Sequence, residues 1–209
     1  MPRYLRLTLA VAVLLLLPVS VFAQDTPPEG FRNLTTSDRL LSMDYPVDWV
    51  AALTPGQTVV LATDESLFEG FDPESYRFAP GEASLSLMFI SSAHAEESGL
   101  LGDTLLSQLA YVMQITTPED NEENPRITFG DIEALELSDG NAGFQVNYAI
   151  LQDLEGSLYI WNVTEDLTVL ATLSAAPGEA QALQEPMLHV IDSVVFSGTV
   201  EAVFSEDEE

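Results

Sequence analysis

The chemistry open to this sequence is limited by its two histidines and by its lack of cysteine. His94 lies in a polar segment that we expect to be an exposed loop, where a nearby carboxylate would let it titrate near neutrality. His189 lies between Leu188 and Val190, beside an apolar helix face, and we expect a structural role for it. Nucleophilic catalysis needs a base beside a hydroxyl or thiol, and an ordinary zinc site needs three protein ligands. The sequence therefore predicts no catalytic residue, no cofactor and no defined metal site.

Carboxylates are abundant, with 34 Asp and Glu residues, so chance pairs of them are expected. The segment between Pro118 and Pro125 offers hard oxygen ligands without the spacing of an EF-hand. We expect weak calcium binding there at most, and the candidate ligands are Glu119, Asp120, Glu122 and Glu123. A hydrolase would need a general acid and a general base that flank one bond, and the candidates for that alternative are Asp64, Glu65, Asp72 and Glu74.

Residues 64–82 are rich in Gly, Pro, Asp and Glu and predict a long loop. Loops of this length are uncommon in compact domains and often carry function. Four aromatic side chains in this segment would hold the loop against the body of the protein and cover a pocket. They are the candidate ligand-binding residues: Phe68, Phe71, Tyr76 and Phe78.

The formal net charge is −28, and all six basic residues are arginines. Because nucleic-acid and anionic-lipid surfaces need clustered Lys and Arg, these partners are not expected. A solvated, self-repelling surface would keep the protein soluble and monomeric. The alternatives are recognition of a basic partner or of divalent cations, and adaptation to high salt.

Residues 1–23 have the pattern of a cleaved signal peptide. Arg3 and Arg6 precede an apolar run over 7–21, which is too short to span a bilayer. We therefore expect export to the periplasm, the cell envelope or the extracellular space, with no transmembrane segment in the mature chain. Residues 24–37 are expected to be a flexible leader, 38–197 a single domain, and 198–209 an acidic, disordered tail.

The first half of the domain predicts three strands in a meander, at 40–45, 49–53 and 58–63, and a further strand at 84–90. A helix follows, which Asp103 would cap. Its apolar face is expected to consist of Leu105, Leu106, Leu109, Val112 and Met113.

The second half predicts four strands joined by compact turns, at 127–137, 142–151, 157–162 and 167–175. A closing helical region covers 178–193, and we expect a break in it with Pro186 as the first residue of the final helix. The fold class is α+β, with a central antiparallel sheet covered by helices.

Three stretches of the chain resemble the PsbP-like family, whose fold is shared by the Ran-binding Mog-type proteins. They are Met43-Asp44-Tyr45-Pro46-Val47-Asp48-Trp49, the strand at 167–175 with Ala176-Pro177, and 186–196 ending in Ser-Val-Val-Phe. The resemblance implies an α-β-α sandwich in an exported bacterial protein with a non-enzymatic binding or assembly role. No residue matches a partner-binding position closely enough to carry a role over.

We therefore expect an exported, non-enzymatic binding or assembly module whose partner is an unidentified protein or a small apolar ligand. The alternatives are the carboxylate-based hydrolase and a purely structural envelope protein.

Overall fold

The computed structural model describes residues 27–37, 39–54, 57–68, 77–92, 95, 100–116, 127–150 and 153–199. The predicted signal peptide and most of the predicted tail lie outside these residues. No helix within the described ranges is long and apolar enough to cross a membrane.

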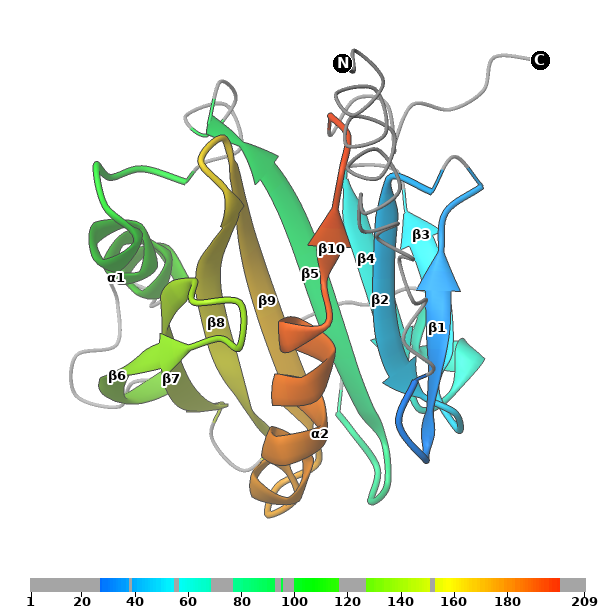
Figure 1. The fold of residues 1–209 in the computed structure, drawn as a ribbon. Helices are drawn as coiled ribbons and strands as arrows, with labels where there is room; N and C mark the ends of the chain where they lie inside the picture. Colours follow the sequence, from blue (N-terminus) through cyan, green and yellow to red (C-terminus); the bar gives the residue numbers. More distant parts are fainter. Residues whose placement is uncertain are drawn as a thin grey trace, which may run out of the picture.

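In this part of the chain, seven strands form one antiparallel sheet (Figure 1). From one edge to the other, its strands are β3 (Val50–Thr54), β4 (Thr58–Ala62), β5 (Ala83–Ser91), β9 (Leu167–Ala175), β8 (Leu154–Thr164), β7 (Ala142–Ile150) and β6 (Ile127–Glu136). Consecutive strands are neighbours except at the centre, where β9 pairs with β5. The α+β class is confirmed.

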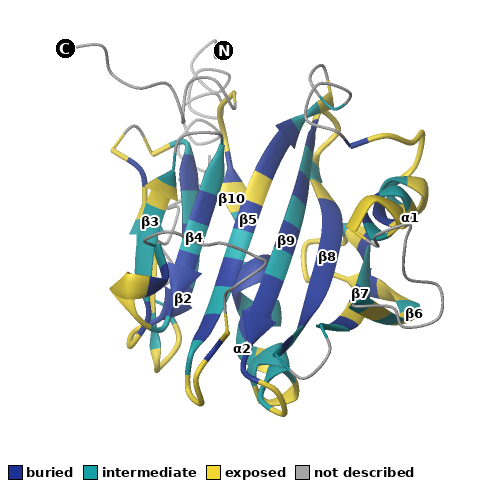
Figure 2. Cartoon of the chain, turned by 180° about the vertical axis from the view of Figure 1, so that it is seen from behind, coloured by how far each residue is buried: buried dark blue, intermediate teal, exposed yellow. Residues whose placement is uncertain are grey.

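The alternation of buried and less buried side chains along β5 explains why this strand lies at the centre of the sheet. Leu85, Leu87 and Phe89 are fully buried and point to one face, which we call the front face. Leu85 pairs with Leu173 of β9, so the apolar row continues across the sheet. Figure 2 shows the buried residues concentrated on β5, β8 and β9.

β8 begins three residues earlier than predicted, because Gly156 is a strand residue and not part of a turn. A Cβ atom at Gly156 would lie 1.9 Å from the Leu173 carbonyl oxygen, so only glycine allows this close approach of β8 to β9. The predicted turn therefore shortens, and β8 pairs with β9 from Glu155 onward.

A second, smaller sheet packs on the front face through Leu41 and Met43. It consists of β1 (Phe31–Thr35), β2 (Leu41–Pro46) and β10 (Val195–Phe196). The prediction that 40–63 forms one meander is wrong, because the turn at 47–49 moves the chain from this sheet into the large one. β1 also lies within the range that we expected to be a flexible leader, and it is held by five pairs with β2.

The first helix, α1 (Leu105–Thr116), packs on the opposite, back face through Leu109 and Val112. Leu106 is 45% exposed, so it is not part of the packed face. The predicted cap at Asp103 is also wrong. Thr104 Oγ1 accepts from the Ser107 amide at 3.2 Å, and the Thr104 amide donates to Ser107 Oγ at 3.0 Å, which is a reciprocal capping pair.

The second helix, α2 (Ala180–Asp192), packs on the front face through Met187, Val190 and Ile191. Pro186 lies inside this helix, so the predicted break at Pro186 is wrong. Proline removes one backbone hydrogen bond from a helix interior. The helix continues because buried side chains after Pro186 hold it on the sheet.

Candidate functional site

The front face of the sheet extends beyond α2 onto β7 and β6, and several of its side chains there are polar. Register places Gln145 of β7 opposite Tyr159 of β8, and Asn147 opposite Ser157. Alternate strand residues share a face, so these four side chains lie together beside α2. β8 is a core strand, but near its beginning it carries the hydrogen-bonding side chains of Ser157 and Tyr159.

Hydrogen bonds order these side chains across three strands. Gln145 Nε2 donates to Glu133 Oε2 of β6 at 2.9 Å, and Ser157 Oγ donates to Asn147 Oδ1 at 2.7 Å. The Ser157 hydroxyl therefore donates its hydrogen bond to an amide oxygen, which is not a base. This arrangement suits binding and does not activate Ser157 as a nucleophile.

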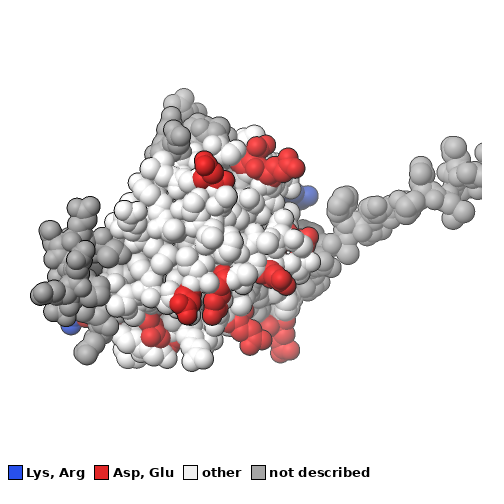
Figure 3. Space-filling model, turned by 90° about the vertical axis from the view of Figure 1, so that its left-hand side faces the viewer, with Lys and Arg blue, Asp and Glu red and all other residues white. Residues whose placement is uncertain are grey.

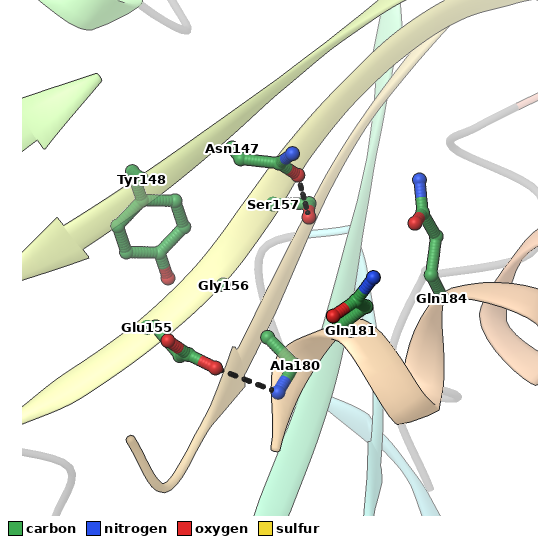
Figure 4. A pocket seen from close by; sticks show the side chains of 8 residues that line it. All are labelled: Asn147, Tyr148, Glu155, Gly156, Ser157, Ala180, Gln181 and Gln184. Carbon is green, nitrogen blue, oxygen red and sulfur yellow. Dashed lines mark hydrogen bonds between the residues drawn. The ribbon is translucent and has the colours of Figure 1, made fainter. Parts of the chain in front are cut away.

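The first of two hollows along α2 has a volume of about 300 Å³ and lies where the first half of the helix meets β7 and β8 (Figure 4). Its lining is mostly amide, hydroxyl and carboxylate: Asn147, Tyr148, Glu155, Gly156, Ser157, Ala180, Gln181 and Gln184.

The second hollow, of about 490 Å³, lies beside the last turns of α2. It is more apolar, and its lining consists of Leu135, Glu136, Leu137, Ser138, Leu188, His189 and Asp192. Helical spacing places Gln181, Gln184, Leu188 and Asp192 on one stripe of α2. We name the surface between this stripe and the side chains of Gln145, Asn147, Ser157 and Leu135 the α2 groove.

Carboxylates fix both ends of α2 to the large sheet. Glu155 Oε1 of β8 accepts from the Ala180 amide at 3.0 Å, at the N-terminal end of the helix, where a negative charge is favourable. Asp192 Oδ1 accepts from the Ser138 amide at 2.6 Å, just beyond β6. These two bonds attach α2 to β8 at its first turn and to the segment after β6 at its last turn.

Two further polar side chains, Tyr159 and Gln145, face the same side of the sheet as the groove, but neither lines either hollow. Tyr159 is fully buried with its hydroxyl beside that of Ser157, and Gln145 Oε1 makes no hydrogen bond in the described structure. Burial raises the pKa of the Tyr159 hydroxyl, and the adjacent Ser157 hydroxyl lowers it in part. Tyr159 is thus a neutral side chain of the front-face core.

The charge around the groove is negative. Glu155 lines the first hollow and Glu136 and Asp192 the second, and neither lining contains an arginine. Figure 3 shows the side of the molecule at the β6 edge, where acidic side chains are spread over the surface and basic ones lie only at its margins.

Two of the four aromatic residues predicted to bind a ligand pack in the core, and the other two lie outside the described residues. Phe78 is 5% exposed and belongs to the back-face core, and the half-buried Phe68 packs against the same cluster. Phe71 and Tyr76 lie outside the described residues. Their role in binding a ligand stays a prediction, and the α2 groove lies on the other face of the sheet.

His189 is the histidine that the structure places. Its Nε2 atom lies 3.5 Å from Asp44 Oδ2, and its ring contacts the edge of Phe31 with centroids 4.4 Å apart. Asp44 also accepts from Asn33 Nδ2 at 3.0 Å, and its amide donates to Ser193 Oγ at 2.8 Å. These contacts join α2 to the small sheet. His94 lies outside the described residues.

Asp64 and Glu65, two of the four hydrolase candidates, are in the described part. Asp64 Oδ1 accepts from the hydroxyl of Ser66 at 2.6 Å and from its amide at 2.9 Å, at the start of the 3₁₀ helix Glu65–Phe68. These bonds lower the pKa of Asp64, so it stays ionised and is a poor general acid near neutrality. The other two candidates, Asp72 and Glu74, lie outside the described residues.

The predicted calcium ligands, Glu119, Asp120, Glu122 and Glu123, also lie outside the described residues. Within those residues, no group of three or more His, Asp or Glu side chains is placed to hold a metal ion.

Comparison with solved structures identifies the fold. The Ran-binding protein Mog1p of Saccharomyces cerevisiae is 8% identical, with a TM-score of 0.51 over 80% of this chain and 95% of Mog1p. The cyanobacterial PsbP protein of Synechocystis is 14% identical, with a TM-score of 0.48 over 82% of this chain and 95% of that protein. The Mog1p match confirms the fold that the sequence resemblance predicted, and at this identity it shows the fold alone. Comparison with protein-family models and with curated proteins finds no match.

Sequence reasoning missed the α2 groove. Its residues come from four separate elements and follow no motif. The alternation of β7 would have placed Gln145 and Asn147 on one face. The register of β7 with β8, and the position of α2, follow only from the structure.

Proposed function

We propose that this protein is an exported, non-enzymatic binding or assembly module that receives a partner protein in the α2 groove. The observation that carries the proposal is the pair of hollows along α2, which are lined by hydrogen-bonding side chains and lie on a helix that Glu155 and Asp192 attach at both ends.

Further support comes from the leader and the fold. Residues 1–23 have the charge and length pattern of a signal peptide that directs export, and the mature domain is proposed to be an α-β-α sandwich of the PsbP-like kind. Mog1p, which has this fold, is a Ran-binding protein. A fold that binds a protein in Mog1p supports an assembly role here.

A blocked groove tests the proposal. Gln184→Trp places a bulky side chain over the first hollow without changing the net charge, and Leu106→Trp adds the same side chain on α1, at the opposite face. We expect the wild-type protein and Leu106→Trp to capture the same protein from an extract of the exporting cell's envelope. Gln184→Trp should lose it at equal folded concentration. Equal capture by all three proteins would contradict the proposed site.

A further inference from the structure

We propose that His189 and Asp44 form a pH-dependent link between α2 and the small sheet, which becomes an ion pair when His189 takes up a proton. The inference goes beyond the proposed function and does not depend on it, because both residues belong to the domain itself. We call this pair of side chains the His189–Asp44 link.

The contact between the two side chains is incomplete while His189 is neutral. His189 Nε2 lies 3.5 Å from Asp44 Oδ2, which is longer than an ordinary N–H···O hydrogen bond. The same nitrogen is shielded from water and makes no hydrogen bond in the described structure. A protonated imidazole carries a hydrogen on both nitrogens. Protonation therefore places a donor and a positive charge on the side of the ring that faces the carboxylate.

Hydrogen bonds hold Asp44 in a position to accept from the ring. Asn33 Nδ2 donates to Asp44 Oδ1 at 3.0 Å, which leaves Oδ2 on the side of His189. The Asp44 amide donates to Ser193 Oγ at 2.8 Å, and that hydroxyl donates to the Val190 carbonyl at 2.7 Å. The Asp44 side chain is 16% exposed, whereas that of His189 is 34% exposed and can exchange a proton with water. A shielded, fixed carboxylate interacts more strongly with a charge than a free surface group does.

The charged neighbours of His189 on α2 and β6 are carboxylates. Glu185 precedes it by four residues and Asp192 follows it by three, and residues at these spacings are neighbours on a helix surface. Glu136, at the end of β6, lines the second hollow together with His189 and Asp192. A positive charge on the ring thus meets no opposing cation from these two elements.

The small sheet presents an aromatic ring and a carboxylate to His189. Phe31 of β1 contacts the imidazole through its edge, and Asp44 of β2 lies beside it. Arg32, the next residue of β1, is directed elsewhere, because its guanidinium lies over the ring of Tyr45 at 4.6 Å from the centroid. The arginine therefore does not take the place of the imidazolium beside Asp44.

Protonation changes how firmly the small sheet is attached. The other contacts between β2 and α2 are the apolar packing of Leu41 and Met43 and the bond from the Asp44 amide to Ser193. These contacts carry no group that titrates between pH 5 and 8, whereas histidine changes its charge in this range. The ion pair therefore contributes at mildly acidic pH and is lost as the pH rises past neutrality.

A double-mutant cycle of His189→Gln and Asp44→Asn at two pH values tests the link. Urea unfolding of the wild type, the two single variants and the double variant gives the coupling between the two side chains. We expect a coupling of about fivefold in the folding equilibrium constant at about pH 5.5, and of less than about 1.5-fold at about pH 8.5. His94 is present in all four proteins, so its titration cancels.

Glu185→Gln in place of Asp44→Asn is the matched control, and its coupling to His189→Gln should stay below about twofold at both pH values. Equal coupling of His189 and Asp44 at both pH values, or none at about pH 5.5, would overturn the inference.

Hydrogen exchange of the wild-type protein decides the question if a variant fails to fold. After correction for intrinsic rates, the amides of β2 should exchange about fivefold more slowly, relative to those of β8, at about pH 5.5 than at about pH 8.5. An unchanged ratio between β2 and β8 would also overturn the inference.

Discussion

Tyr148 is the residue that ties β7, β8 and β9 together. Its hydroxyl donates to the Leu173 carbonyl at 3.0 Å and lies 2.8 Å from Ser174 Oγ. Gly156 of β8 stands between these strands, and a Cβ atom there would lie 2.9 Å from the Tyr148 hydroxyl oxygen. Burial raises the pKa of Tyr148 to about 12, and the bond to Ser174 opposes this in part.

This pKa predicts a loss of stability at alkaline pH. The folded pKa lies above the ordinary value of 10.0, so the contribution of Tyr148 is complete below pH 10 and is lost as the pH rises toward 12. A shift of this size corresponds to about 3 kcal/mol. Urea unfolding between pH 9 and 12 should show the fall, and no lysine is present to titrate in the same range.

Tyr148→Phe is the control for that prediction. The variant should be less stable at pH 8, because it leaves the Ser174 hydroxyl and one bond of the Leu173 carbonyl unmade, and its stability should fall less steeply above pH 10. The same slope in wild type and variant would show that other groups cause the alkaline loss. Tyr159, whose pKa is also raised by burial, is then the next residue to replace.

The reciprocal capping pair of Thr104 and Ser107 predicts that substitutions at Thr104 and at its neighbour Asp103 change the free energy of unfolding by different amounts. Thr104→Ala should lower the free energy of unfolding by about 1 kcal/mol, because it removes the acceptor for the first-turn amide of Ser107. Asp103→Ala should change it by less than about 0.5 kcal/mol, since Asp103 is exposed and Thr104 supplies the cap. Denaturant unfolding measures both, and a larger loss in Asp103→Ala would reverse the assignment.

At the level of elements, α2 is the helix that forms one wall of the groove. Its sequence alone predicts a break at Pro186 that the structure does not show. The burial of Met187, Val190 and Ile191 and the carboxylate anchors at both ends outweigh the cost of an internal proline. Local propensity is a weak prior in such a case, because tertiary contacts decide whether the helix continues.

The position of Pro186 inside α2 predicts that its replacement stabilises the protein. Pro186→Ala restores an amide that can donate to the Ala182 carbonyl, a gain of up to about 3 kcal/mol. The unfolded chain of the variant is more flexible than that of the wild type, which offsets about 1 kcal/mol of this gain. We expect a net gain of about 2 kcal/mol in chemical denaturation. Glu185→Ala, on the same helix, is a control that leaves the backbone bonding unchanged, and a loss of stability in Pro186→Ala would contradict the prediction.

At the scale of the whole molecule, alternation and turns predicted most strands of the large sheet, since β5, β7 and β9 carry clear apolar patterns and well-separated turns. The small sheet could not be predicted, because the turn after Pro46 changes the direction of the chain without a distinctive pattern. The groove could not be predicted either. It depends on the register of Gln145 with Tyr159 and on the placement of α2, which are properties of the assembled core.

The net charge of −28 predicts that salt stabilises the folded protein. The ion pair of Arg77 with Asp153, at 3.2 Å, lies at the surface with an exposed arginine and adds little, so repulsion among the carboxylates dominates the electrostatics of the compact state. Raising the salt from about 0.05 to about 0.5 M shortens the screening length from more than 10 Å to less than 5 Å and relieves this repulsion. We expect the Tm to rise by several degrees in NaCl and equally in KCl. A Tm that is unchanged or falls would mean that the acidic groups lie too far apart, or are too well hydrated, to repel one another.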